Sequence, residues 1–253
     1  MKLAAQLYTV RDHTKNENAI YETLKKVKAI GYDAVQISAF GEFRTSWLSE
    51  VLRELDLEVC ATHTALDRII NDTEKVVEEH KALGCKTVGL GWYKTDSKEK
   101  ADELLAMLEP ALKKLHASGL QFAYHNHDHE FTEIEEGYTV MDYLRDQSDP
   151  ELFHFLPDFY WVAHAGVSPL QFIEDFRGRF SVVHFKDLKR VDGKPVMTEI
   201  FNGEIDYVAI HDRLVELQVE WAAVEQDLCE VDPFLSLEIS LKNIKEKKLF
   251  SLL

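Results

Sequence analysis

Short runs of apolar residues alternate with longer segments whose apolar residues recur every three or four positions, and this alternation continues along the whole chain. Runs of four or five apolar or β-branched residues are typical of buried strands, whereas the longer period is typical of amphipathic helices. We therefore predict eight strands, at Leu3–Leu7, Ala34–Ile37, Glu58–Ala61, Thr87–Leu90, Gln121–Tyr124, Phe153–Leu156, Ser181–Phe185 and Trp221–Val224.

Helices are predicted in the intervals between these strands. The first interval places apolar residues on one helical face at Ile20, Leu24, Val27 and Ile30. Several predicted helices end at a glycine, the residue that most readily adopts the left-handed conformation of a helix C-cap. These glycines are Gly31, Gly84 and Gly119.

The order of these elements predicts the fold class. Strands that alternate with helices pair in parallel, and eight such units in 253 residues match a closed (β/α)8 barrel, the TIM barrel. The open-sheet alternative is disfavoured because the chain contains neither GxGxxG nor a P-loop motif. No Pro/Ser-rich linker divides the chain, so we predict an α/β fold with one domain spanning residues 1–253.

The chain is strongly acidic, with 45 Asp and Glu against 29 Lys and Arg and a net charge of −16. Such a field repels phosphate backbones and anionic membranes, so we expect neither nucleic acid nor a membrane as a partner. The N-terminus lacks the apolar segment of a signal peptide, and no run of about 18 apolar residues occurs. Three dispersed cysteines are typical of reduced thiols, and we expect a cytoplasmic protein.

Residues that can bind metals cluster where predicted strands end. The segment Tyr124–Phe131, with the sequence YHNHDHEF, follows the fifth strand, and further acids and a histidine follow or end the next three strands. The C-terminal ends of parallel strands share one face of a barrel, and imidazole and carboxylate groups bind borderline divalent metals. We therefore predict a metal site on this face. Its ligands would be His125, Asp158, His184 and Glu225.

The first four strands supply further candidate residues for the same face. Gln6 and Gln36 are amides in otherwise apolar strands, and each could contact substrate or hydrogen-bond a neighbouring strand. His63 follows the third strand and is a candidate for the chemistry. The candidate substrate contacts are completed by Trp92, Asn126 and Trp161. The two tryptophans could equally serve as packing at the barrel rim.

Four motifs together resemble the sugar phosphate isomerase/epimerase family of xylose-isomerase-like barrels, which includes inosose dehydratases and ketose 3-epimerases. The motifs are Tyr124–Phe131, Asp158–Trp161, His184–Asp187 and Glu225–Asp227. The resemblance covers essentially the whole chain and implies a divalent metal held at the ends of strands five to eight. The chain departs from it at His125, where the epimerases usually carry glutamate, so His127 or Glu130 could supply that ligand instead. It departs again at Phe201, which replaces the first glycine of a loop that contacts substrate in relatives.

The resemblance and the residue types imply a metal-dependent carbohydrate isomerase or epimerase. Two imidazoles among four ligands favour Mn, Co, Zn or Fe over Mg. The metal would polarise the carbonyl of a keto-sugar or keto-polyol and stabilise an enediolate. Glu225 is the first candidate for removing the adjacent proton, followed by His63 and Glu130.

Other interpretations stay open from the sequence. Loss of a β-hydroxyl assisted by His127 or Lys186 would make the protein a dehydratase of an inosose-like or 3-keto sugar, although Lys186 could instead form a structural ion pair with Asp187. A phosphodiesterase-type nuclease would share the barrel but conflicts with the acidic charge. A catalytically inactive barrel that binds a sugar is the third alternative. The expected partner is a small carbohydrate, and the sequence leaves a homo-oligomer open.

Overall fold

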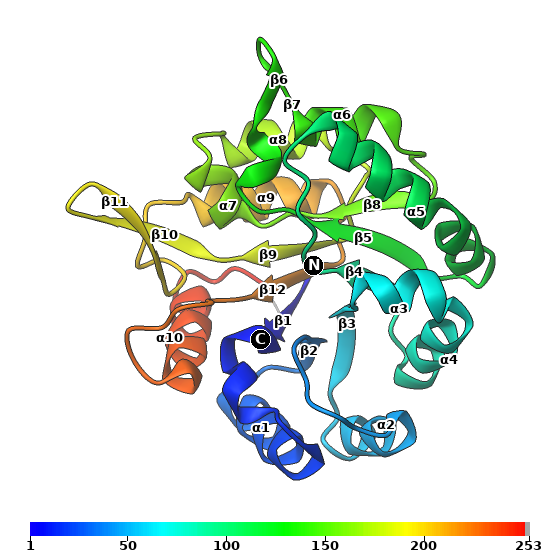
Figure 1. Ribbon diagram of the computed structural model, residues 1–253. Helices are drawn as coiled ribbons and strands as arrows, with labels where there is room; N and C mark the ends of the chain where they lie inside the picture. Colours follow the sequence, from blue (N-terminus) through cyan, green and yellow to red (C-terminus); the bar gives the residue numbers. More distant parts are fainter. Residues whose placement is uncertain (251–253) are drawn as a thin grey trace.

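Eight parallel strands form a nearly closed barrel in the computed structural model, which describes residues 1–250. Around the barrel the strands are hydrogen-bonded in the order β8-β5-β4-β3-β2-β1-β12-β9 (Figure 1). At the seam, a parallel bridge joins Asp158, just after β8, to His184 in β9. The strands are β1 (Lys2–Gln6), β2 (Ala34–Ile37), β3 (Glu58–His63), β4 (Thr87–Leu90), β5 (Gln121–His125), β8 (Phe153–Leu156), β9 (Val182–Phe185) and β12 (Trp221–Val224).

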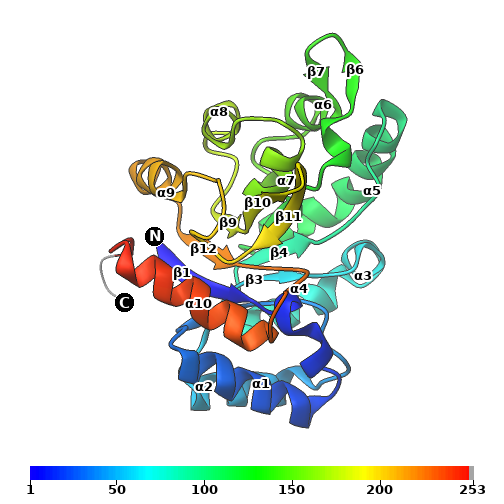
Figure 2. The same cartoon turned by 90° about the vertical axis from the view of Figure 1, so that its left-hand side faces the viewer.

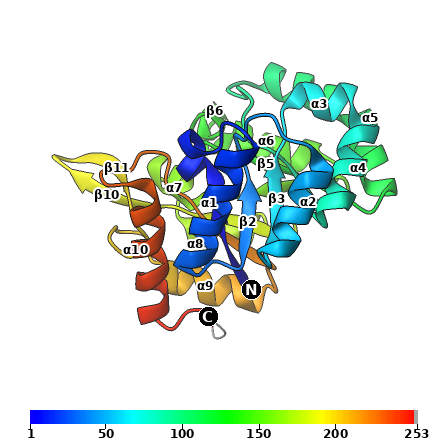
Figure 3. The ribbon, with the colours of Figure 1, turned by 90° about the horizontal axis from the view of Figure 1, so that it is seen from below.

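Helices surround the barrel and connect its strands (Figure 2). In α1 (Glu17–Ile30), the side chain of Asn16 accepts a hydrogen bond from the first turn, and Gly31 ends the helix with a φ of 113°. The other helices are α2 (Thr45–Glu54), α3 (Leu66–Asn71), α4 (Thr73–Leu83), α5 (Lys98–Ala117), α6 (Val140–Gln147), α7 (Phe159–His164), α8 (Pro169–Asp175), α9 (Tyr207–Glu216) and α10 (Pro233–Glu246), with short 3-10 turns η1 (Leu7–His13) and η2 (His129–Phe131). Figure 3 shows α10, α1 and α2 along one flank of the barrel. In the part of the chain that the structure describes, no helix is both long and apolar enough to cross a bilayer.

The fold class predicted from the sequence is confirmed. The bounds of β2, β4, β8 and β12 coincide with the prediction, and the other four strands differ by one or two residues at their ends. Gly31, Gly84 and Gly119 all have positive φ, as predicted for helix C-caps. The apolar pattern was sufficient because strands of a parallel barrel are buried on both faces.

Two antiparallel hairpins were not predicted as strands. They are β6–β7 (Glu133–Glu135 and Tyr138–Thr139) and β10–β11 (Asp187–Val191 and Lys194–Thr198), and both project from the barrel (Figure 1). Their strands are short and only partly buried, so the apolar pattern does not mark them. Asp192 and Gly193 form the turn between β10 and β11, and both have the positive φ that a two-residue hairpin turn requires.

The interior of the barrel changes from apolar to polar along its axis. One layer is apolar and mostly small, formed by Ala4, Ala34, Cys60, Ala61, Ala123, Leu156, Val182, Trp221 and Ala223. Towards the C-terminal ends of the strands the buried side chains are polar, and they are Gln6, Gln36, His125, Asp158, His184 and Glu225. The apolar layer therefore lies directly beneath the polar cluster inside the barrel.

Candidate metal and active site

Four strands each deliver one candidate ligand to the same end of the barrel. His125 is the last residue of β5, and Asp158 lies two residues beyond β8. His184 lies within β9, and Glu225 directly follows β12. All four side chains are buried, at 4% exposure or less. The convergence predicted from the spacing of these residues is therefore present in the fold.

The four donor atoms have the mutual spacing of a divalent metal site. His184 Nδ1 lies 3.0 Å from His125 Nε2 and 3.0 Å from Glu225 Oε2. Asp158 Oδ2 lies 3.6 Å from His125 Nε2 and 3.7 Å from His184 Nδ1. In a tetrahedral site with bonds of about 2.1 Å, ligand atoms are about 3.4 Å apart. The residues present therefore fit a divalent cation.

Two buried amides orient two of these ligands. Gln36 Oε1 lies 2.7 Å from His184 Nε2, which leaves Nδ1 of that ring directed towards the other donors. Gln6 donates from Nε2 to Glu225 Oε1 at 2.5 Å, which leaves Oε2 directed the same way. Both amides are fully buried behind the ligands. Their geometry is that of residues that fix the orientation of metal ligands, and their predicted contact with substrate remains a prediction.

Asp158 is held from both sides. Its Oδ1 caps α7 by accepting the N–H of Tyr160 at 2.9 Å, so Oδ2 is the oxygen that faces the other ligands. Its own N–H donates to Asn126 Oδ1 at 2.9 Å. Asn126 is fully buried and joins the ends of β5 and β8. Substrate contact by Asn126 likewise remains a prediction.

Lys186 places an ammonium group beside the ligand oxygens. Its Nζ lies 2.9 Å from Asp158 Oδ2, 3.0 Å from Glu225 Oε2 and 2.9 Å from Asp227 Oδ1. Burial opposes its charge, but the three carboxylates outweigh burial and raise the pKa of Lys186 well above its usual value. Burial also disfavours the charge of Glu225, yet Lys186 and His184 hold the pKa of Glu225 below its usual value. The cluster is thus an ionised network.

The alternative in which Lys186 forms an ion pair with Asp187 is wrong. Asp187 turns away from Lys186 and accepts four backbone N–H bonds, from Leu188, Phe201, Gly203 and Ile205. Burial raises the pKa of Asp187 to about 6. Its carboxylate fastens the segment between β11 and α9 to the start of β10. Lys186 lies in the junction between β9 and β10, and there the two neighbouring side chains have different partners: Lys186 contacts carboxylates of the cluster and Asp187 accepts from backbone N–H groups.

A cavity of about 290 Å³ opens above the ligands. Its lining consists of Tyr8, Ser38, Ala39, His63, Gly91, Trp92, His125, His127, Lys186, Glu225 and Asp227. Three of these residues, Tyr8, Ser38 and Asp227, were not predicted from the sequence as site residues. Asp227 lies two residues after Glu225 in a motif that was recognised, whereas no pattern in the sequence marks Ser38.

His63 faces this cavity from the end of β3. Its Nδ1 lies 3.2 Å from Ser38 Oγ, and its ring centre lies 5.1 Å from that of His125. A Cβ on Gly91 would come within 2.7 Å of the His63 ring, so the missing side chain at Gly91 makes room for the imidazole. Burial lowers the pKa of His63 well below its usual value, which keeps the ring neutral.

The structure places His127 and Glu130, the two alternative ligands after β5, in different surroundings. His127 lines the cavity beside Trp161, with ring centres 5.5 Å apart, and burial lowers the pKa of His127 to about 2. Glu130 is fully buried beneath the loop, where it accepts from Tyr124 OH at 2.5 Å and from the His127 N–H at 2.8 Å. The position of Glu130 supports a role in holding the loop. A catalytic role for it stays an untested prediction.

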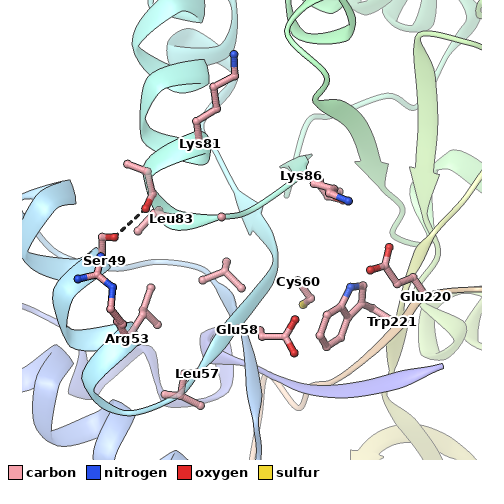
Figure 4. Close-up of a pocket in the computed structure, with 15 residues that line it drawn as sticks. Ser49, Arg53, Leu57, Glu58, Cys60, Lys81, Leu83, Lys86, Glu220 and Trp221 are labelled. Atoms are coloured by element: carbon pink, nitrogen blue, oxygen red, sulfur yellow. Dashed lines mark hydrogen bonds between the residues drawn. The ribbon is translucent and has the colours of Figure 1, made fainter.

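A larger cavity, of about 480 Å³, lies at the opposite end of the strands (Figure 4). It is bordered by Glu58 and Thr87, which begin β3 and β4, and by Trp221, which begins β12. Among residues 1–250, the His, Asp and Glu groups spaced to hold a metal lie elsewhere. In barrels of this type the N-terminal face serves stability and the C-terminal face serves chemistry, so the smaller cavity is the candidate active site.

Two solved structures are similar to this protein over nearly its whole length. The structure is similar to a sugar phosphate isomerase/epimerase from Parabacteroides distasonis, with a TM-score of 0.83, 17% identity, and coverage of 96% of this chain and 93% of that one. It is also similar to the IolI protein with a bound zinc atom, with a TM-score of 0.71, 18% identity and coverage of 100% of both chains. These identities establish a shared fold.

A curated relative is matched over a shorter stretch. The inosose dehydratase of Geobacillus kaustophilus is 28% identical over 131 residues, which are 46% of this chain and 41% of that enzyme. The matched stretch thus spans less than half of either protein. The family model matches residues 24–233, which confirms the resemblance carried by the sequence motifs: the chain belongs to the xylose isomerase-like TIM barrel family.

Proposed function

We propose that this protein is a divalent-metal-dependent enzyme that moves a proton next to the carbonyl of a small keto-sugar or keto-polyol, as an isomerase or epimerase. The observation that carries the proposal is the convergence of His125, Asp158, His184 and Glu225 beneath one cavity. The sugar phosphate isomerase/epimerase and the zinc-bound protein of the same fold support it. A small carbohydrate is the proposed partner. The free Cys60, Cys85 and Cys229 fit a proposed cytoplasmic location.

The chemical types of the four donor groups indicate which metal the site would bind. Two imidazoles and two carboxylates favour Mn, Co, Zn or Fe over Mg, which prefers oxygen ligands. A bound divalent cation at this position supplies polarisation of a substrate carbonyl. Gln6 and Gln36 keep the donor atoms aligned before binding, which reduces the reorganisation that binding requires.

Proton movement is assigned to residues that face the cavity. His63 is neutral and partly buried, and within the described chain its Nε2 has no hydrogen-bond partner, so this nitrogen can hold a substrate proton. Glu225 Oε2 lies across the cluster and is the second candidate. Asp227 and Lys186 line the cavity beside them and are placed to bind substrate hydroxyl groups.

Dehydration is the second candidate function, and the match to an inosose dehydratase is the observation that favours it. In this case a group of the cavity protonates a β-hydroxyl, which leaves as water after the adjacent C–H bond is broken. Lys186 carries protons at Nζ and contacts the ligand carboxylates, so it is the proposed donor, with His127 as the alternative.

The test measures metal content and proton exchange on the same protein. Untagged protein purified without chelators is analysed by metal mass spectrometry, and deuterium uptake from D2O into keto-sugars and inososes is followed by NMR. We expect about one Mn, Co, Zn or Fe per chain. His184→Ala and Glu225→Gln should lose both the metal and the exchange, whereas the exposed-side control Glu216→Gln should lose neither.

The products separate the two candidates. Deuterium at the carbon next to the carbonyl with retention of all oxygens supports isomerisation or epimerisation, and release of water supports dehydration. Absence of metal after reconstitution with each of these ions would overturn the proposal, and the inactive sugar-binding barrel would then be favoured.

A further inference from the structure

Within residues 1–250, the cavity at the mouth of the barrel is lined by no cation free of an ion pair that could meet a charged substrate. Lys186 is the one Lys or Arg among the described residues that line the cavity, and three carboxylates surround its ammonium group. With a divalent cation bound, three negative charges would be balanced by one ammonium and two metal charges. The site would then be close to neutral, and a phosphate dianion would enter it without a counter-charge.

Basic residues in the loops around the mouth are also engaged. Arg11 stacks on the Tyr8 ring at 4.3 Å and donates from Nη1 to the backbone oxygens of Tyr8 and Asp227. Lys94 pairs with Asp96 at 3.1 Å, and Lys189 pairs with Glu230 at 3.1 Å. Binding a phosphate here would require breaking one of these contacts in a protein whose net charge is −16.

Two large apolar side chains are exposed at or beside the rim of the cavity. Trp92 lines the cavity from the segment after β4 and is 61% exposed, although tryptophan is among the side chains that gain most from burial. One side of its indole lies near His129, with ring centres 6.4 Å apart. Leu228, which follows the cavity residue Asp227, is 71% exposed. Ligand pockets are commonly lined by aromatic side chains, and the exposed indole of Trp92 is placed to contact a ligand in this one.

We infer that the substrate is an uncharged keto-sugar glycoside whose apolar aglycone stacks on Trp92 while its sugar ring occupies the cavity over the ligand cluster. This inference rests on the proposed function and adds the substrate class to it. The polar cavity residues Lys186 and Asp227 face the sugar hydroxyls, and the exposed indole contacts the group attached to the sugar.

The test compares three matched compounds on manganese-loaded full-length protein. They are the methyl glycoside of a 3-keto-hexopyranose, its phenyl counterpart, and the 6-phosphate of the methyl compound. Calorimetry gives the dissociation constants, and NMR gives deuterium uptake next to the carbonyl. We expect the phenyl glycoside to bind about tenfold more tightly than the methyl glycoside, and the phosphate at least about tenfold more weakly.

Variants then assign the preference to one side chain. Trp92→Ala should reduce the phenyl-to-methyl affinity ratio to about one, and Trp92→Phe should retain part of it. Val215→Ala, which removes an exposed apolar side chain from α9, should leave the ratio unchanged.

The outcomes separate this inference from the proposed function. Equal or tighter binding of the phosphate, or a phenyl preference that survives in Trp92→Ala, would overturn the inference while deuterium uptake still supports the function. Binding with the expected preference but without deuterium uptake would overturn the function and leave the substrate class standing. Binding of none of the three compounds would overturn both.

Discussion

Buried amides beside the candidate ligands show how single residues shape this site. Gln36 accepts from His184, and Gln6 donates to Glu225, so each leaves one ligand atom aimed at the cluster. From the sequence these amides could have been either substrate contacts or internal hydrogen-bond partners. Their full burial supports the second role, because a fully buried side chain can act on the site through the ligands that it touches.

The first prediction concerns Gln36. Gln36→Met keeps the volume of the side chain but removes the oxygen that fixes the His184 ring, so metal affinity should fall about 10- to 100-fold. Titration against a fluorescent chelator measures this, with Gln171→Met on the exposed surface of α8 as the matched control. An affinity equal to that of the wild type would show that packing alone orients His184.

The second prediction concerns His80, a buried imidazole distant from the ligand cluster in sequence. It lies 2.8 Å from Thr62 Oγ1 and 2.7 Å from the Val76 carbonyl oxygen, and burial lowers its pKa in the folded protein. Below about pH 6.5 the unfolded chain therefore binds a proton that the folded protein does not. The stability contribution is complete above this pH and is lost as the pH falls.

Urea unfolding between pH 7 and pH 5, with a chelator present, measures this effect. His80→Gln should lower the dependence of unfolding free energy on pH by up to about 1.4 kcal/mol per pH unit. Identical pH dependence in wild type and variant would show that His80 titrates normally in the folded protein.

At the scale of elements, the segment between β11 and α9 is fastened by one carboxylate. Asp187, the first residue of β10, accepts from the N–H groups of Phe201, Gly203 and Ile205. Phe201 has a φ of 68°, in the left-handed region that glycine adopts most readily. A Cβ on Gly203 would come within 2.3 Å of the Asp187 carboxylate, so glycine is required there.

The third prediction tests this attachment. Asp187→Ala removes the acceptor of three N–H groups in the segment, so their amide hydrogens should exchange faster, and stability should fall by about 2–4 kcal/mol. Hydrogen exchange followed by mass spectrometry on peptides covering residues 199–206 measures the change. Glu133→Ala, an exposed carboxylate of the other hairpin, should leave exchange in this segment unaltered. Unchanged protection in Asp187→Ala would contradict the attachment.

At the scale of the whole molecule, charged side chains form one buried cluster in the barrel and many exposed pairs on the surface. The metal-type residues meet inside one end of the barrel, whereas most ion pairs lie on the surface with both side chains partly exposed. Exposed pairs of this kind contribute little to stability. The net charge of −16 therefore acts mainly as long-range repulsion within the folded molecule.

The fourth prediction follows from this repulsion. Raising NaCl from 0.01 to 0.2 M shortens the Debye length from about 30 Å to below 10 Å, so repulsion is screened and the unfolding free energy at pH 7.5 should rise by about 1 kcal/mol. Urea is the suitable denaturant because it carries no charge. A fall in stability with salt would show that the exposed ion pairs outweigh the repulsion.

Much of the architecture could be predicted from local patterns. The strands β2, β4, β8 and β12 were predicted with their observed bounds because they are buried on both faces and are punctuated by polar or glycine residues. The hairpin β10–β11 was not predicted, because its strands are only partly buried and give no clear apolar pattern. The candidate ligands could be predicted because each lies within two residues of the C-terminal end of a strand, on the face where barrels bind ligands.

The sequence by itself determined the barrel, its family and the four candidate ligands, since these depend on periodicity and on position relative to strand ends. Only the tertiary structure decided the partners of the side chains. It directed Lys186 to Asp158, Glu225 and Asp227, and it turned Asp187 towards the backbone of a distant segment. It also buried Glu130, a candidate ligand or base from the sequence, beneath the loop after β5. The physical reason is that hydrogen bonds and ion pairs form between groups brought within about 3 Å by strands far apart in sequence, and no local pattern encodes that distance.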